Sequence, residues 1–227
     1  MIRKSNAEML TELVPLAGKI VVDVGCGDGF LVRLMTRNGA HVTGLESSPG
    51  QLRRARAHIP EGDEIYIPGQ AQYLPMGDGS TDLVVFANSL HHVPVADMPL
   101  ALSEAARALR PGGFLYVSEP IADGPFFQLT RLIDDETEVR AQALATLRQD
   151  GPSLGLREQT EVFYISTVRH ADYASFQDRM TAIDETRAQR VAQHDAALRA
   201  AFAAQGHRTD KGWCFDQPMR VNLLIKV

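Results

Sequence analysis

The sequence predicts an α/β fold in which a mostly parallel sheet carries helices on both of its faces. Two observations predict this fold. Short apolar runs typical of buried strands alternate with helical patterns over residues 19–118, and the first run ends in a glycine-rich turn. Strands that alternate with helices form parallel sheets through right-handed crossovers. We therefore expect a single α/β domain over residues 1–227.

Each element of the alternating region has its own local signal. The expected strands are short apolar runs rich in β-branched and aromatic side chains, at residues 19–24, 41–46, 64–67, 82–86 and 114–118. Apolar residues at helical spacing predict helices in the first fifteen residues and at residues 30–35, 49–57 and 97–109. Gly39 is expected to end one helix in the left-handed conformation, and Asp97 is a candidate N-cap.

The alternation stops after residue 119. Helical pieces are expected over residues 130–147 and 173–183, with a short strand at residues 162–165 between them. We expect residues 120–188 to form a lid insertion within the single domain, which covers the site and selects the substrate. The aromatic candidates for an apolar lid, with plain core packing as the alternative, are Phe126, Phe127, Tyr164, Tyr173 and Phe176.

The last forty residues return to regular patterns. Apolar residues at helical spacing from Val191 to Phe202 predict one amphipathic helix that Gly206 ends. Residues 220–227 form a strand-like run. Together with residues 208–215 this run is expected to make an antiparallel hairpin at the edge of the sheet.

The composition narrows the classes of function. The 227 residues are 44% hydrophobic and 22% charged, which is typical of a packed globular protein, and the formal net charge is −5. A negative balance argues against nucleic acids and anionic membranes as partners. The two cysteines lack metal-ligand spacing, the first apolar stretch is interrupted by acidic residues, and no apolar run reaches about 18 residues. We therefore expect a cytoplasmic monomer or homodimer with no metal, secretory signal or membrane span.

The strongest functional signal is the segment Asp-Val-Gly-Cys-Gly-Asp-Gly at residues 23–29, where the first expected strand meets the first crossover helix. Its glycines allow a sharp turn and a close approach of a ligand, and the helix N-terminus behind them favours a carboxylate or phosphate. A dinucleotide-binding turn places glycine where this chain has Phe30. An unpaired Asp23 carboxylate repels a diphosphate and attracts an ammonium or sulfonium group. The turn therefore favours S-adenosylmethionine over NAD, and a turn without any ligand is the remaining alternative.

Glu46 gives the second signal, at the end of the second expected strand and 19 residues after Gly27. In parallel α/β folds the carboxyl ends of the strands face the ligand crevice, where an acidic side chain binds the ribose hydroxyls. We therefore predict that Glu46 binds a ribose. The alternative is a solvated residue or a helix cap.

These motifs resemble those of the class I S-adenosylmethionine-dependent methyltransferases over roughly residues 20–119. The segments that carry the resemblance are residues 23–29, Glu46-Ser47-Ser48, Ala71-Gln72-Tyr73-Leu74-Pro75 and Leu109-Arg110-Pro111-Gly112-Gly113. The chain is most similar to the small-molecule branch, which includes quinone-biosynthesis methyltransferases. The resemblance implies a Rossmann-like three-layer sandwich whose seven-stranded sheet has a reversed last strand.

The resemblance also implies roles for individual residues. Gly25, Gly27 and nearby backbone would hold the methionine end of S-adenosylmethionine, while Gln70 and Ala71 would border the adenine. Gln70 departs from the family, which usually has Asp there. A neutral amide oxygen accepts the same hydrogen bond, but contributes about 0.5–1.5 instead of about 1.5–3 kcal/mol. The predicted cofactor-binding residues are Asp23, Gly25, Cys26, Gly27, Glu46, Ser47, Gln70, Ala71, Gln72, Asn88 and Ser89.

The fourth expected strand leads into residues 88–92, which in this family pass under the transferable methyl group. His91 and His92 are the candidate catalytic residues, because a histidine takes a proton from an attacking hydroxyl or carbon acid. The alternative is that both are structural. Because they are adjacent, we expect them to point in different directions and not to share a metal ion. Glu119, after the fifth strand, is a further candidate.

The sequence therefore predicts methyl transfer from S-adenosylmethionine to a small-molecule acceptor by in-line displacement. The sulfonium is already a good leaving group, so positioning and exclusion of water supply much of the acceleration, and no catalytic triad is required. Two alternatives stay open. One is a non-catalytic protein that binds S-adenosylmethionine or S-adenosylhomocysteine, and the other is an NAD-dependent oxidoreductase on a similar sheet.

Overall fold

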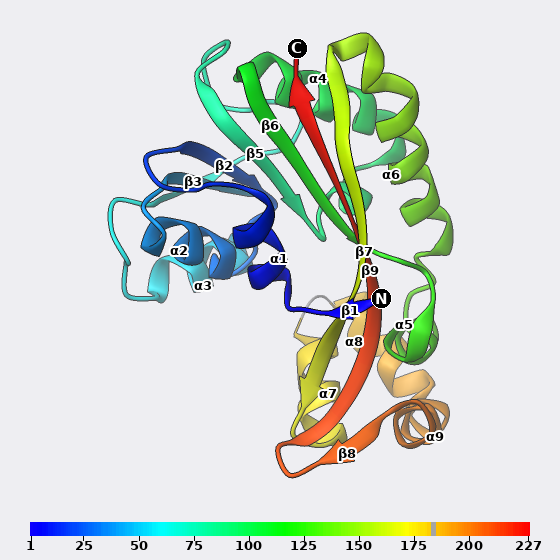
Figure 1. Ribbon diagram of the computed structural model, residues 1–227. Helices are drawn as coiled ribbons and strands as arrows, with labels where there is room; N and C mark the ends of the chain where they lie inside the picture. The colour runs from blue at the N-terminus through cyan, green and yellow to red at the C-terminus, as the bar shows by residue number, and fades with distance from the viewer. Residues whose placement is uncertain (183–184) are drawn as a thin grey trace. The chain divides into compact units, whose positions relative to one another are not determined.

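The computed structural model describes residues 1–182 and 185–227, which form two compact units (Figure 1). The first, called the sheet unit below, comprises Asn6–Glu119, Ala141–Val162 and Arg220–Val227. The second, called the aromatic unit, comprises Met1–Ser5, Pro120–Arg140 and Phe163–Met219.

The sheet unit is built on five parallel strands. These are β2 (Ile20–Val24), β3 (His41–Glu46), β4 (Ile65–Pro68), β5 (Thr81–Ala87) and β6 (Leu109–Pro120). They lie in the order β6-β5-β2-β3-β4, and each pair of neighbours is parallel. Beside β6 lies β9 (Gly212–Lys226), and β7 (Leu156–His170) lies beside β9. The ribbon shows the C-terminal half of β9 running opposite to β6 (Figure 1). The predicted α/β fold with a reversed last strand is therefore confirmed.

The helices of the sheet unit follow the predicted alternation. They are α1 (Asn6–Leu13), α2 (Phe30–Arg37), α3 (Pro49–Ala57), α4 (Met98–Ala108) and most of α6 (Thr137–Asp150), with the 3₁₀ turns η1 (Leu90–His92), η2 (Val95–Asp97) and η3 (Pro152–Leu154). One core joins apolar side chains of β2, β5 and β6 with those of α4 and α6, including Val22, Phe86, Val117, Leu102 and Leu147. Because the central strands are buried on both faces, their sequences are apolar without alternation.

Local signals explain where two of these helices begin and end. Gly39 follows α2 with a φ of 86°, as predicted for the end of a helix. Asp97 precedes α4 as predicted, but its side chain makes no capping hydrogen bond. Its carboxylate instead accepts a hydrogen bond from Nε2 of Gln72 at 2.9 Å. Asp97 therefore lies at the predicted N-cap position, but the prediction that its side chain caps the helix was wrong.

The aromatic unit combines short helices with parts of the two longest strands. Its elements are β1 (Ile2–Arg3), α5 (Gly124–Thr130), α7 (Tyr173–Thr181), α8 (Glu185–Gln193), α9 (Asp195–Gln205) and β8 (His207–Thr209), together with residues 163–170 of β7 and 212–219 of β9. Its core is a cluster of aromatic and aliphatic side chains: Leu129, Ile133, Phe176, Met180, Val191, Leu198, Phe202 and Phe215.

The helix predicted over residues 191–202 was wrong, because two helices occupy this region. The backbone leaves the helical conformation at His194, with a φ of −108° and a ψ of 14°. A new helix starts at Asp195, whose carboxylate accepts a hydrogen bond from the hydroxyl of Tyr173 and pairs with Arg199. An acidic residue in the first turn favours a helix start.

The predicted terminal hairpin was also wrong in its boundaries. Residues 212–226 form one continuous strand, and the hairpin joins β8 to the beginning of that strand, with His207 paired to Cys214. Pro218 lies within this strand, although proline donates no backbone hydrogen bond. In the structure its carbonyl accepts a hydrogen bond from the N–H of Ile121 at 2.9 Å, so β9 continues through it.

The predicted insertion at residues 120–188 is divided between the two units. Residues 141–162 belong to the sheet unit, because α6 packs against its core through Ala143 and Leu147. The role of the remainder as a lid stays a prediction. Three of the lid aromatics are buried, which favours core packing for them: Phe127, Tyr164 and Phe176. No helix within residues 1–182 and 185–227 has the length and apolar character needed to cross a membrane.

Candidate functional site

The glycine-rich turn joins β2 to α2 with three left-handed glycines. Gly25, Gly27 and Gly29 have φ values of 73°, 58° and 77°. A Cβ atom on Gly25 would lie 2.6 Å from Cβ of Ser89, and one on Gly29 would lie 2.5 Å from the ring of Tyr66. By contrast, no atom lies within 4 Å of the Cβ position of Gly27. Packing therefore requires the outer glycines, while the middle glycine borders open space that a ligand can enter.

Glu46 is the last residue of β3 and connects that strand to the glycine turn. Its Oε2 accepts a hydrogen bond from the N–H of Gly27 at 2.8 Å, and its Oε1 accepts one from the N–H of Ser48 at 2.7 Å. The side chain is buried, with 8% of its surface exposed. Each carboxylate oxygen accepts more than one hydrogen bond, so the group retains capacity for ligand hydroxyls. The neighbouring Ser47 is exposed.

Asp23 adds a second buried carboxyl group next to Glu46. It lies on β2, paired with Gly44 and Val85, and is 2% exposed. Burial, followed by the negative charge of Glu46, raises the pKa of Asp23 to about 7. Burial and the same two carboxylates also raise the pKa of Cys26, so this buried side chain stays a neutral thiol. Two close carboxyl groups favour a positively charged ligand.

The segment after β4 contains the predicted adenine contacts, and its side chains lie in different surroundings. The side chain of Gln70 is exposed, and its backbone carbonyl accepts a hydrogen bond from the N–H of Tyr73. Ala71 packs in the apolar core, and Gln72 is buried and hydrogen-bonded to Asp97. Of the three predicted residues, Gln70 is therefore the one whose side chain is open to solvent.

The segment after β5 lies over the glycine turn. Asn88 is exposed and has a φ of 56°, the one positive φ of a non-glycine residue in the described ranges. Such backbone strain is concentrated at functional sites. The hydroxyl of Ser89 donates to the carbonyl of Val24 at 2.6 Å, and its Cβ faces the position that a side chain at Gly25 would fill. The structure thus brings Ser89 and the glycine turn together, as the site prediction requires.

His91 forms a buried pair with Glu119, the second-last residue of strand β6. Nδ1 of His91 is hydrogen-bonded to Oε2 of Glu119, and Oε1 of Glu119 accepts a hydrogen bond from the N–H of Leu90 at 2.9 Å. The side chains of His91 and Glu119 are each 2% exposed. A histidine whose Nδ1–H donates to a carboxylate has its ring orientation and tautomer fixed, which makes Nε2 the basic nitrogen.

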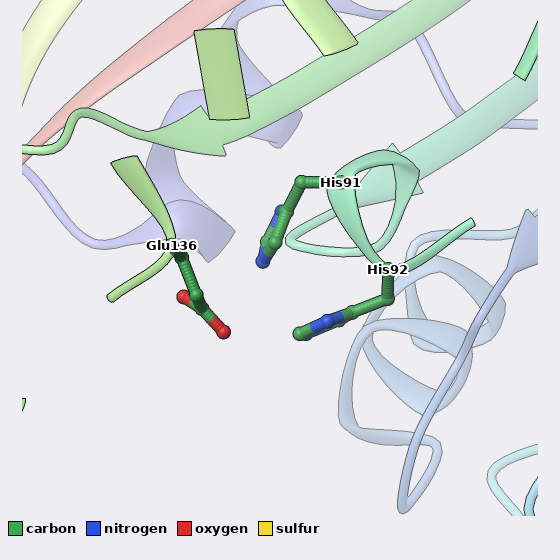
Figure 2. Close-up of side chains that lie close together, drawn as sticks. All are labelled: His91, His92 and Glu136. Carbon is green, nitrogen blue, oxygen red and sulfur yellow. The ribbon is translucent and has the colours of Figure 1, made fainter. Parts of the chain in front are cut away.

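The expectation that His91 and His92 point in different directions was wrong. Their ring centroids are 4.0 Å apart and the ring planes are inclined by 45°. Figure 2 shows both rings projecting from η1 toward the same side. The expectation assumed a strand, in which neighbouring side chains alternate, whereas these residues form a 3₁₀ turn. His92 is exposed, in contrast to the buried His91.

These groups gather at the carboxyl ends of β2, β3, β5 and β6, where parallel α/β sheets bind their ligands. The sequence drew attention to His91 and Glu119 separately but gave no sign that they form a pair. Glu119 stood out only as a polar residue after an apolar strand, and its 28-residue separation from His91 gave no local signal. Tyr66 was missed entirely, although a glycine opposite an aromatic ring is a common packing device.

Comparison with known proteins agrees with this geometry. Residues 22–117 match the methyltransferase domain family. A ubiquinone biosynthesis O-methyltransferase of Methylobacterium sp. (strain 4-46) is 40% identical over 106 residues, which are 46% of this chain and 42% of that protein. A 27-O-demethylrifamycin SV methyltransferase of Amycolatopsis mediterranei (strain S699) is 38% identical over 118 residues, which are 49% of this chain and 43% of that protein. The matches thus span less than half the length of these relatives.

The likeness of fold extends further than the likeness of sequence. A crystal structure of a protein from Bacillus halodurans C-125 superposes with a TM-score of 0.66 at 18% identity, and covers 97% of this chain and 98% of that chain. The glycine turn, Glu46 and the polar ends of β5 and β6 all lie within or directly beside residues 22–117. Residues 22–117 therefore form a domain of the methyltransferase family that they match, and the resemblance to the class I S-adenosylmethionine-dependent methyltransferases is supported over this part of the chain.

Proposed function

We propose that the protein transfers a methyl group from S-adenosylmethionine to a hydroxyl group of a small-molecule acceptor. The observation that carries the proposal is the buried His91–Glu119 pair at the same edge of the sheet as Asp23 and Glu46. A positioned base therefore lies at the edge that holds the carboxyl groups suited to a cationic cofactor.

The residues of the turn fit S-adenosylmethionine. The open space beside Gly27 suits the methionine part, and the carboxyl groups of Asp23 and Glu46, when ionised, complement its ammonium and sulfonium groups. The second lone pairs on the Glu46 carboxylate suit the ribose hydroxyls. When bound, the cofactor supplies an electrophilic methyl group. The diphosphate of NAD would instead meet two carboxyl groups, which disfavours the oxidoreductase alternative.

The His91–Glu119 pair suits a hydroxyl acceptor. As the acceptor oxygen bonds to the methyl carbon and the sulfur–carbon bond breaks, the hydroxyl proton moves to Nε2 of His91. Glu119 holds Nδ1–H and stabilises the imidazolium that results. Two relatives support oxygen as the acceptor atom, since their names describe O-methylation in ubiquinone biosynthesis and of a demethylrifamycin. His92 adds an exposed ring beside His91, and a contact with the acceptor is proposed for it.

The cofactor assignment is tested by isothermal titration of the purified chain with S-adenosylmethionine and, separately, with NAD. We expect S-adenosylmethionine to bind and NAD to bind more weakly. Asp23→Asn, which removes one negative charge with little change in size, is expected to weaken binding of S-adenosylmethionine. Tighter binding of NAD would contradict the assignment.

The reaction is tested by incubation with methyl-labelled S-adenosylmethionine and a panel of phenols, catechols and hydroquinones, with mass spectrometry to locate the added methyl. Label on oxygen supports the proposal. Label on nitrogen or carbon would change the acceptor class. Cofactor binding without label in any product of the panel would favour the non-catalytic alternative.

A further inference from the structure

A row of buried polar side chains continues from the His91–Glu119 pair into the interior of the sheet unit. Its central members are Arg220 and Asn222 on β9, which are 9% and 1% exposed, and Glu119 on β6, which is 1% exposed. Charged and amide side chains are rare in the middle of a buried sheet, where apolar residues of similar volume are often equally stable. Because these side chains lie beside a candidate catalytic pair, we considered whether they act on that pair.

The strand register places Arg220 directly opposite Glu119. Strands β6 and β9 are neighbours, and the N–H of Ile121 donates to the carbonyl of Pro218 at 2.9 Å. In an antiparallel pair, a step of two residues along each strand in opposite directions gives the next pair on the same face. Two residues back from Ile121 is Glu119, and two residues on from Pro218 is Arg220. Their side chains therefore share one face as cross-strand neighbours.

The other end of the row leads to the surface through β7. Nε of Arg220 donates to Oδ1 of Asn222 at 2.8 Å. Nδ2 of Asn222 donates to Glu158 and Glu161, each at 2.9 Å. Glu161 also pairs with the half-exposed Arg148 at 2.8 Å. Hydrogen bonds thus connect Arg220 to Asn222, and Asn222 to the two glutamates on β7.

We propose that Arg220 is a positioning residue for methyl transfer, whose guanidinium stabilises the negative charge of Glu119 and thereby sets the orientation and proton affinity of His91. The statement about methyl transfer rests on the proposed function, whereas the coupling between Arg220 and His91 does not.

The charges around Arg220 give the direction of the effect. The charged groups that face it are Glu119 on β6, Glu158 and Glu161 on β7, and Arg148 on α6. Burial lowers the pKa of Arg220, and the charges of Glu119 and Glu161 act against that change. A permanent positive charge next to Glu119 disfavours a further proton on the His91–Glu119 pair. Without this charge, the pair retains its proton to a higher pH.

The coupling is tested on the whole chain by NMR titration of ¹³C-labelled histidine rings, with His91 assigned from the spectrum of His91→Gln. In Arg220→Gln we expect the titration midpoint of His91 to rise by about one pH unit. Arg220→Lys, which keeps the charge, is expected to stay close to wild type. The matched control is Arg110→Gln, the same change at the other end of β6, where Arg110 pairs with Asp82. An unchanged midpoint in folded Arg220→Gln would overturn the proposal.

A second variant keeps the test decisive if Arg220→Gln does not fold. Glu161→Gln removes a partly exposed negative charge that lies 4.0 Å from Nε of Arg220. It leaves the positive charge of Arg220 less compensated, so the midpoint of His91 is expected to fall. A rise, or no change, would contradict the proposal.

The same variants separate this proposal from the proposed function. With a methylated acceptor in hand, Arg220→Gln is expected to shift the acid limb of the kcat profile upward, lowering kcat about tenfold near neutral pH with recovery at alkaline pH. A shift of the His91 midpoint in a protein that methylates no acceptor would retain the coupling and reject the enzyme assignment. Loss of kcat at every pH with an unmoved midpoint would show a merely structural arginine.

Discussion

Two histidines are almost equally buried in this chain, His91 in the sheet unit and His170 in the aromatic unit, with 4% and 5% of their surfaces exposed. His91 is paired with the carboxylate of Glu119. His170 lies among the rings of Phe126, Phe176 and Phe215, and its Nε2 has no hydrogen-bond partner within the described residues. Burial, followed by the charge of Arg179, lowers the pKa of His170 to about 4.

This difference shows that burial does not by itself make a histidine functional. An anionic partner orients the ring and stabilises its charged form, whereas aromatic neighbours keep it neutral. This difference supports the proposed role of His91 in chemistry and indicates a packing role for His170. The place of His170 in the aromatic core argues against a contact between its ring and a polar acceptor.

The largest expected effect tests whether His91 and His170 differ in their contribution to catalysis. His91→Gln removes the proposed proton acceptor, and we expect kcat/KM for methyl transfer to fall by roughly 10²–10⁴-fold. His170→Leu keeps an apolar side chain in the aromatic core and is expected to leave kcat/KM within about threefold of wild type. Steady-state kinetics of both variants at pH 8 checks this. Equal losses in the two variants would show that the distinction between them is wrong.

The next largest effect concerns Glu46 and Glu64, whose carboxylates each accept hydrogen bonds from two backbone N–H groups. Glu46→Ala removes the group that accepts two backbone hydrogen bonds and suits the ribose hydroxyls, so binding of S-adenosylmethionine is expected to weaken by about 2 kcal/mol or more. Glu64 provides a matched control, since its carboxylate also accepts from two backbone N–H groups, those of Glu61 and Gly62. Glu64→Ala is expected to cost stability and leave the dissociation constant unchanged. Calorimetry on both variants measures the difference, and an unaltered constant in Glu46→Ala would refute its role.

A third prediction concerns pH and the aromatic unit. The pKa of His170 is about 4 in the folded chain, whereas the ordinary value for histidine is 6.5, so the unfolded state binds more protons between these limits. The free energy of unfolding is therefore unaffected by this group above pH 6.5 and decreases by about 3 kcal/mol as the pH falls to 4. The single tryptophan, Trp213, packs against the core of this unit and reports its unfolding in urea. In His170→Leu the loss on acidification is expected to shrink. The same loss in both proteins would assign it to another group.

The smallest expected effect concerns the adenine end. Gln70→Asp replaces a neutral acceptor with a charged one at an exposed position, and binding of S-adenosylmethionine is expected to tighten by at most about 1 kcal/mol, or to stay unchanged. Calorimetric titration checks this. Weaker binding in the variant would place Gln70 away from the adenine.

Much of the sheet unit could be predicted because its signals are local. Strand β2 begins one residue after its expected start, and β3 coincides with its apolar run. Glycines at residues 25, 27 and 29 predicted the sharp turn between β2 and α2 correctly, since only glycine adopts these φ values at low cost. Glu46 could be placed at the ligand edge because a strand end is visible in sequence.

The features that could not be predicted depend on tertiary contacts. The 3₁₀ turn that aligns His91 with His92 has no periodicity of its own, and the pairing of His91 with Glu119 requires β5 and β6 to be neighbours. Strand β9 continues through Pro218, whose carbonyl accepts a hydrogen bond from the N–H of Ile121, and the sequence does not reveal this contact. Likewise, α6 belongs to the sheet unit because of what it packs against, and its own sequence has only weak amphipathic character.

The buried Asp23 has a thermodynamic consequence for the ligand-free protein. The folded-state pKa of Asp23, about 7, lies above the ordinary value of 3.8 for aspartate. The folded chain therefore holds this proton where the unfolded chain has released it, and stability declines as the pH rises from about 4 to 7. A cationic cofactor favours the ionised carboxyl group, so its uptake should expel a proton near neutrality. Titrations in buffers with different ionisation enthalpies would detect that release. Occupancy of the site would then depend on ambient acidity as well as on cofactor concentration.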